Sequence, residues 1–164
     1  MITIREATPE DAPLLWRVLA LAASMDGGDE SIAVARNDPK LAVYAEGFPR
    51  GDDLGLVALD AAGGALGAAW LRTGEPSESK VWSEAVPELV IATLPEARGA
   101  GVGTALLEAL LARAQERWPA VALSVREENP AVRLYERLGF VTERTMVNRV
   151  GGRSLAMRWA RPRA

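Results

Sequence analysis

The segment Ile91-Ala92-Thr93-Leu94-Pro95-Glu96-Ala97-Arg98-Gly99-Ala100-Gly101-Val102-Gly103-Thr104 is the most informative part of this chain. An apolar run suited to a β-strand ends at a proline, and three alternating glycines then lead into a long pattern rich in Ala and Leu. A strand, a glycine turn and a helix N-terminus in this order form an anion site from main-chain N–H groups. The helix dipole favours negative charge there, and the missing Cβ atoms let a phosphate approach. The segment therefore predicts a site for a phosphate-bearing ligand.

Two familiar phosphate-binding patterns do not fit this turn. A Walker loop needs Lys-Ser/Thr after the last glycine, and Val102-Gly103-Thr104 contains no lysine. A dinucleotide fingerprint needs a third glycine where Thr104 stands, and an acidic residue about 20 positions later; Ser124 and Arg126 occupy that neighbourhood. The ligand is therefore neither a Walker-type nucleotide nor a dinucleotide of the usual kind.

Composition indicates one folded domain. The chain has 164 residues and is 49% hydrophobic, and its mean hydropathy of +0.02 is too high for a disordered protein. No apolar run approaches the ~20 residues that span a bilayer, and Met1 leads directly into Ile2-Thr3-Ile4 without a leader. These features predict a cytoplasmic protein with no membrane partner.

Charge and residue usage exclude several functions. The net charge is −3, with 19 basic and 22 acidic residues, so no nucleic-acid partner is indicated. The chain has no cysteine and no histidine. Disulfides, a thiol nucleophile, a zinc site of the usual kind and a histidine base are therefore excluded. An all-carboxylate Mg²⁺ or Ca²⁺ site stays open, but no EF-hand spacing occurs, and no metal is predicted. Proton transfer must use Asp, Glu, Tyr, Lys, a terminus or water.

The remaining patterns predict an ordered series of elements. Strands are expected at residues 2–6, 54–59, 65–71, 88–94, 121–125, 140–147 and 154–159. Helices are expected from a hydroxyl cap at Thr8, over 30–46 with a break at Asp38-Pro39, from the glycine turn to about Arg117, and from Asn129 to Gly139. The polar segment 73–87 has the length of a mobile lid or binding loop.

This order predicts an α/β fold. The strand–helix–strand unit over residues 88–125 is expected to form a parallel crossover, and the other strands pair most naturally in antiparallel fashion. The result is a central mixed, mostly antiparallel sheet with helices on both faces.

Separated motifs resemble one family. Arg98-Gly99-Ala100-Gly101-Val102-Gly103 matches the Arg/Gln-x-x-Gly-x-Gly/Ala signature of the GNAT superfamily of N-acetyltransferases. The segment from Asn129 through Leu134-Tyr135 to Gly139-Phe140 is similar to the family's C-terminal motif, and the opening at residues 4–11 is similar to its usual start. The resemblance implies one GNAT domain over residues 1–164, with a coenzyme A-binding core at about 88–140.

The resemblance also implies how acetyl-CoA is bound. The diphosphate would be wrapped by main-chain amides of Arg98, Gly99, Ala100, Gly101, Val102, Gly103 and Thr104. The strand residues Ile91, Ala92 and Thr93 would lie along the pantetheine arm as if the coenzyme were another strand. An N–H near Ile91 would polarise the thioester carbonyl.

Two residues of the C-terminal motif acquire roles in the same way. Asn129 contacts the pantetheine arm in relatives; it also precedes a proline, which is the pattern of a helix N-cap, and the two roles are compatible. Tyr135 corresponds to the family's general acid, which protonates the leaving thiolate. The alternative for Tyr135 is packing against Val132 and Leu138.

The base implied by the resemblance is Glu88, because many relatives use a glutamate on the strand before the glycine turn. Alternation places Glu88, Val90 and Ala92 on one face of that strand. The alternative is that Glu88 is only a solvated strand start. A glutamate used by some relatives at the position of Ser124 is missing.

The resemblance implies an acetyl-CoA-dependent N-acetyltransferase that transfers the acetyl group directly to a primary amine of a small molecule or peptide. Candidate walls of the acceptor site, each of which could instead be core, are Trp16, Tyr44, Phe48, Trp70 and Trp82. A non-catalytic acyl-CoA-binding or regulatory module, a longer acyl group, and a protein N-terminus as acceptor stay open. The acceptor and the oligomeric state, including a homodimer, are not determined by the sequence.

Overall fold

The computed structural model describes residues 1–73, 86–148 and 150–163. The expected lid at 73–87, with Trp82, falls outside these residues except at its ends. The chain divides into two compact units. The first unit contains Met1–Arg72 and Val90–Leu111, and the second contains Thr73–Leu89 and Ala112–Ala164.

The strands form one mixed sheet in the order β1-β2-β3-β4-β5-β7-β6. Their bounds are β1 Thr3–Glu6, β2 Leu54–Leu59, β3 Ala65–Arg72, β4 Glu88–Thr93, β5 Ala120–Arg126, β6 Val141–Val147 and β7 Arg153–Ala160. β4 and β5 pair in parallel, whereas β1 with β2, β2 with β3, β5 with β7 and β6 with β7 pair in antiparallel fashion. The predicted mixed, mostly antiparallel sheet is therefore confirmed.

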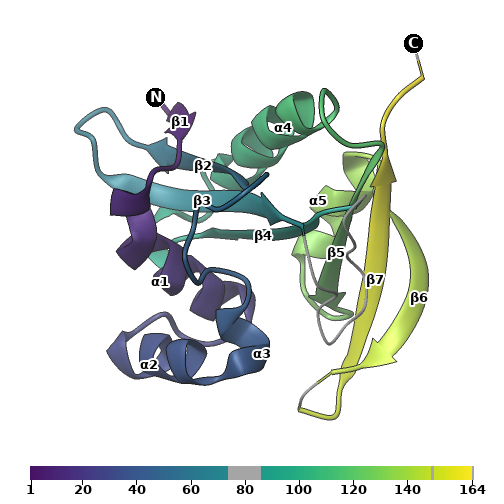
Figure 1. Cartoon of the computed structure of the whole chain (residues 1–164), viewed down its shortest axis with the longest axis horizontal. Helices are drawn as coiled ribbons and strands as arrows, with labels where there is room; N and C mark the ends of the chain where they lie inside the picture. Colours follow the sequence, from purple (N-terminus) through teal and green to yellow (C-terminus); the bar gives the residue numbers. More distant parts are fainter. Residues whose placement is uncertain (74–85, 149, 164) are drawn as a thin grey trace. The chain divides into compact units, whose positions relative to one another are not determined.

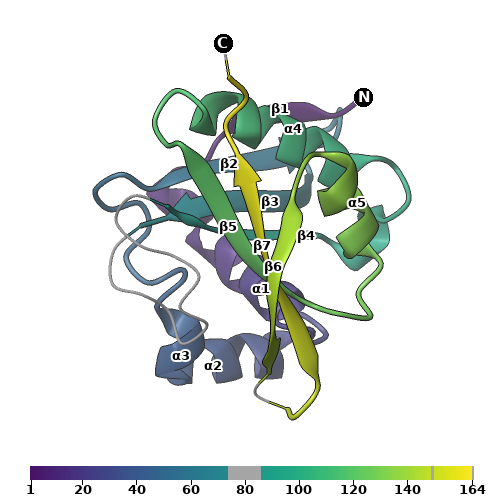
Figure 2. The same cartoon turned by 90° about the vertical axis from the view of Figure 1, so that its right-hand side faces the viewer.

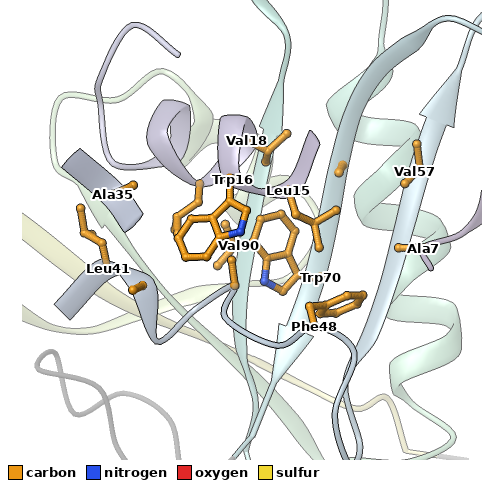
Figure 3. Close-up of a cluster of buried hydrophobic side chains, with 14 of the residues drawn as sticks. Ala7, Leu15, Trp16, Val18, Ala35, Leu41, Phe48, Val57, Trp70 and Val90 are labelled. Carbon is orange, nitrogen blue, oxygen red and sulfur yellow. The ribbon is translucent and has the colours of Figure 1, made fainter. Parts of the chain in front are cut away.

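Three helices precede the first hairpin of this unit: α1 (Ala12–Ala22), α2 (Asp29–Asn37) and α3 (Pro39–Ala42). α1 packs against β3, and α2 packs against α1 and α3 (Figure 1). Figure 3 shows Leu15, Trp16 and Val18 of α1 against Trp70 of β3 and Val90 of β4. Burial of each large apolar side chain contributes roughly 1.5–3 kcal/mol relative to exposure.

Three of the aromatic residues considered as acceptor walls belong to this core. Trp16 and Phe48 are each 7% exposed and Trp70 is fully buried. Phe48 packs edge-on against Trp70, with ring centroids 6.4 Å apart. Among the four candidates that the structure describes, only Tyr44 is half-buried rather than buried, and it packs against the same cluster.

The entry to α1 differs from the prediction in its cap. The chain first makes a short 3-10 turn at Pro9–Asp11, and the Thr8 hydroxyl does not cap it. Instead the Asp11 carboxylate accepts the Thr8 N–H at 2.8 Å and is held by both guanidinium ends of Arg5, each at 2.8 Å. The hydrogen bonds from Arg5 lower the pKa of Asp11. The carboxylate three residues into the turn thus satisfies the main-chain N–H of Thr8, which is the part that the third residue plays in a capping box.

The break between α2 and α3 is confirmed at Asp38-Pro39. The Asp38 carboxylate accepts the Lys40 N–H at 3.0 Å, and its carbonyl accepts the Leu41 N–H at 2.9 Å. Proline at the first position of α3 cannot continue the ladder of α2, so one helix ends where the next begins.

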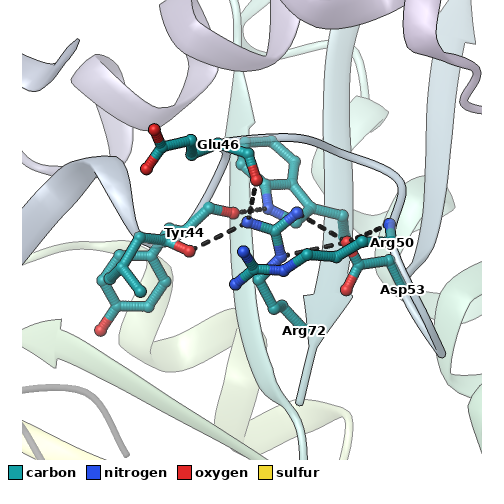
Figure 4. A network of polar contacts seen from close by, with 7 residues as sticks. Tyr44, Glu46, Arg50, Asp53 and Arg72 are labelled. Carbon is teal, nitrogen blue, oxygen red and sulfur yellow. Dashed lines mark hydrogen bonds and ion pairs between the residues drawn. The ribbon is translucent and has the colours of Figure 1, made fainter. Parts of the chain in front are cut away.

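A buried ion pair holds the irregular segment after α3 to β3 (Figure 4). Arg72 and Asp53 have side chains that are 1% and 2% exposed, and their closest atoms are 2.7 Å apart. Arg72 Nη1 also donates to the carbonyls of Val43 and Glu46, at 3.0 and 2.8 Å. The indole N–H of Trp70 donates to the Tyr44 carbonyl at 2.7 Å. Two side chains of β3 therefore donate to main-chain carbonyls of the turns that follow α3.

The second unit carries β5, β7, β6 and the helix α5 (Ala131–Arg137), and Figure 2 shows its long β6–β7 hairpin. β6 is exposed along most of its length, and a bulge lies between Thr142 and Arg144. The helix α4 (Val102–Ala114) ends earlier than predicted, because the chain makes a tighter turn from Ala114 to the buried Trp118. No helix within the described residues is both long and apolar enough to cross a membrane.

Candidate functional site

The glycine turn lies in the first unit, between β4 and α4. After β4 the chain makes a short 3-10 turn at Pro95–Ala97, and Arg98 is extended. Gly99 and Gly101 follow with φ values of +82° and +80°. These left-handed conformations favour glycine, because an L side chain at such an angle is strained. The predicted strand, turn and helix therefore occur in the predicted order.

The surface of this turn is open. Arg98 and the three residues that follow it are exposed, and a Cβ built on Gly99 or Gly101 would meet no atom within 4 Å. Val102, the first residue of α4, is 1% exposed, so its side chain anchors the helix start while its N–H stays at the helix end. The first N–H groups of a helix have no intrahelical partner. The turn can therefore offer several main-chain donors to an anion.

The end of β4 adjoins this turn. Ile91, Ala92 and Thr93 are half-buried, and the Leu94 N–H donates to the Leu66 carbonyl of the β3 side at 2.8 Å. Gly67 of β3 is a residue that the sequence analysis missed. A Cβ at Gly67 would lie 2.6 Å from the Ala92 carbonyl, so only glycine allows the two strands to approach this closely. A glycine inside a strand pattern is the signal that could have identified it.

Glu88 is in the second unit, at the start of β4. Glu88 is 1% exposed and lies opposite Ala122 of β5. The alternative of a solvated strand start is therefore wrong. Burial of a carboxylate is costly unless its surroundings compensate the charge, and such carboxylates are frequently functional.

Asn129 and Tyr135 are also in the second unit. The Asn129 side-chain oxygen accepts the Ala131 N–H at 2.9 Å, which confirms the predicted cap at the start of α5. Tyr135 is 7% exposed and packs edge-on against Phe140, with ring centroids 5.8 Å apart. Burial raises the pKa of Tyr135 to about 12. Its phenol is therefore protonated throughout the physiological pH range, so it is able to donate a proton or a hydrogen bond.

The predicted residues are thus divided between the two units. The first holds the glycine turn and residues 91–93, and the second holds Glu88, Asn129 and Tyr135. Among the described residues, no group of three or more acidic side chains is placed to hold a metal ion.

Comparisons with a family model and with curated proteins both point to acetyltransferases. Residues 29–142 match the model of the GNAT acetyltransferase domain. A mycothiol acetyltransferase of Salinispora tropica is 42% identical over 156 residues, which cover 90% of this chain and 47% of that protein. This chain spans about half the length of the curated relatives it matches.

Solved structures show the same fold. An acetyltransferase of the GNAT family from Streptococcus pneumoniae superposes with a TM-score of 0.70 at 22% identity, covering 99% of this chain and 100% of that one. A GNAT phosphinothricin acetyltransferase from Sinorhizobium meliloti, solved in complex with acetyl-CoA, gives 0.68 at 20% identity, covering 97% of this chain and 88% of that one.

Proposed function

Because this chain belongs to the GNAT acetyltransferase family, we propose that it transfers the acetyl group of acetyl-CoA to an amine in a ternary complex. The observation that carries the proposal is the open glycine turn at the N-terminus of a 13-residue helix, with Gly99 and Gly101 in left-handed conformations. A helix N-terminus favours a diphosphate through its dipole and its free N–H groups.

In this proposal the main chain binds most of the coenzyme. The amides from Arg98 to Thr104 donate to the diphosphate, and the exposed guanidinium of Arg98 adds positive charge. The edge of β4 over residues 91–93 pairs with the amides of the pantetheine arm. The side-chain oxygen of Asn129 already accepts an N–H, so its NH₂ group is the part that donates to the arm.

Three groups perform the proposed chemistry. An ammonium acceptor, with a pKa near 10, must lose a proton before its nitrogen can attack, and Glu88 takes that proton. The N–H of Ile91 stabilises the oxyanion as the carbon–nitrogen bond forms. Tyr135 donates to the sulfur as the carbon–sulfur bond breaks. The second proton of the nitrogen restores the phenol, and the overall reaction releases one proton to solvent.

The raised pKa of Tyr135 limits how it can act. A phenol with a pKa of about 12 is a weaker acid than a thiol of about 8.5, so complete transfer would be uphill by roughly 5 kcal/mol. Tyr135 therefore acts best as a hydrogen-bond donor to the developing thiolate, with its proton moving only as the nitrogen's proton replaces it.

Thiol release from acetyl-CoA tests the proposal. The acceptors to screen are small amines, polyamines, peptides with a free N-terminus and the acceptor of mycothiol acetyltransferases, whose name the matching relatives carry. We expect amine-dependent thiol release, which Tyr135→Phe lowers by roughly tenfold to a hundredfold while leaving the Kd for acetyl-CoA unchanged. Binding of acetyl-CoA without turnover of any amine would instead indicate an acyl-CoA-binding module.

A further inference from the structure

An ion pair joins α1 to the turn that precedes the glycines. Arg17 of α1 contacts Glu96 through both ends of its guanidinium, at 3.4 and 3.3 Å. The two residues are 79 positions apart in the sequence. Their side chains are 34% and 61% exposed. Both residues belong to the first unit, as does the glycine turn.

Stability does not explain this pair. Ion pairs with this much exposure contribute little to folding, because water screens the charges and the long side chains lose freedom. The position of Glu96 is more informative, since it precedes Arg98 by only two residues and lies in the short 3-10 turn that leads into the glycines. A carboxylate at that point places negative charge next to a proposed binding site for an anion.

Glu96 is ionised at neutral pH. Its own main-chain N–H lowers the pKa of its carboxyl, and the hydrogen bond from Arg17 lowers it further. A diphosphate that entered the turn would therefore meet a charge of the same sign, unless a cation stood beside the carboxylate. In the structure Arg17 is the cation that pairs with this carboxylate.

We propose that Arg17 is a positioning residue for the coenzyme: by pairing with Glu96 it neutralises the carboxylate beside the glycine turn and so favours entry of the diphosphate. The inference rests on the proposed function, because it needs a coenzyme diphosphate as the ligand. Exposed charges near one another in water interact weakly but measurably, so loss of Arg17 is expected to weaken coenzyme A binding by roughly threefold at low salt.

The direction in which each of three variants changes the Kd for coenzyme A tests the proposal. Isothermal titration with coenzyme A gives the Kd for Arg17→Gln, Glu96→Gln and the double variant at low salt and at high salt. We expect Arg17→Gln to weaken binding, Glu96→Gln to leave it equal or tighter, and the double variant to return close to wild type. Arg17→Lys keeps the charge and is expected to bind like wild type. High salt should remove the differences, because the interaction is screened.

A matched control is available in the same unit. Arg5→Gln changes the net charge equally and also breaks a two-pronged pair with a carboxylate, that of Asp11. Arg5 lies on β1, three strands from β4 in the sheet and so ~14 Å away from it in the pairing direction. We expect its Kd for coenzyme A to equal that of wild type, and thermal unfolding reports whether each variant is folded.

The outcomes separate the two proposals. Equal weakening by Arg17→Gln and Glu96→Gln would show that the pair only shapes the turn, and an unchanged Kd in folded Arg17→Gln would show that it does not influence the ligand; either result overturns the inference while the proposed function stands. Failure of the wild type to bind coenzyme A would overturn the proposed function, and the inference with it.

Discussion

Tyr135 illustrates how one residue's surroundings decide its chemistry. It is buried in the second unit against Phe140, and this burial raises the pKa of its phenol to about 12. The sequence could predict the tyrosine, because the Asn…Leu-Tyr…Gly-Phe pattern identifies it. The pattern could not predict the degree of burial, which depends on residues packed around α5. Glu88 shows the same limit: a charged residue at the start of an apolar run suggests exposure, yet it is 1% exposed in a strand flanked by β3 and β5.

The Tyr135 phenol makes stability depend on pH in the alkaline range. Its pKa is about 12 in the folded protein and about 10 in the unfolded chain, so the unfolded chain loses the proton first. Stability from this group is complete below about pH 10 and falls as the pH rises toward 12. Between pH 9 and pH 11 we expect wild type to lose about 1 kcal/mol more than Tyr135→Phe. Urea unfolding of both proteins at pH 9 and pH 11 measures this difference. Equal losses of stability in the two proteins would contradict the raised pKa of Tyr135.

At the scale of an element, the turn between β4 and α4 follows from local chemistry and was predictable. Proline after the strand, glycines with positive φ and an apolar helix each act within a few residues. The buried ion pair between Arg72 and Asp53, which holds the segment after α3, was not predictable. Arg72 and Asp53 are 19 positions apart, and Asp52-Asp53 in an irregular segment has the pattern of a solvated loop. A pairing of this kind depends on the fold rather than on neighbouring residues.

Gly101→Ala tests whether the open turn holds a ligand. The substitution places a side chain at a φ of +80°, which costs about 1 kcal/mol of folding stability. Gly63→Ala in the β2–β3 turn is a matched control, since Gly63 has a φ of +87° and likewise no atom within 4 Å of the added Cβ. We expect similar losses of stability from both variants, but weaker coenzyme A binding only from Gly101→Ala. Equal affinities would show that the space above Gly101 is not used.

Breaking the buried pair should be far more costly than changing its neighbour. In Asp53→Asn the Arg72 guanidinium keeps its contacts with the Val43 and Glu46 carbonyls but loses its counter-charge. Removal of one partner from a buried pair typically costs 3–5 kcal/mol, so we expect a loss of about 3 kcal/mol in urea unfolding. Asp52→Asn, at an exposed neighbouring position, is expected to change stability by less than about 0.5 kcal/mol. Similarly small losses of stability in the two variants would contradict a stabilising role for the buried ion pair.

For the whole molecule, the parallel unit and the antiparallel hairpins were predictable, because each follows from the sequence between its strands. The position of β7 between β5 and β6 was not predicted. The division into two units was not predictable, since the boundary runs through β4 and α4 rather than along a linker. It separates the glycine turn from Glu88, Asn129 and Tyr135. The sequence could not distinguish aromatic residues that line an acceptor site from those of the core. An aromatic residue in an apolar stretch has the same sequence pattern in either place, and only packing shows that Trp16, Phe48 and Trp70 belong to the core.

A crystal structure of the chain with acetyl-CoA would show whether main-chain N–H groups of the glycine turn hold the diphosphate. We expect diphosphate oxygens at hydrogen-bond distance, about 2.7–3.2 Å, from main-chain nitrogens of residues 99–104. A structure in which the coenzyme binds elsewhere, or leaves this turn empty, would contradict the account.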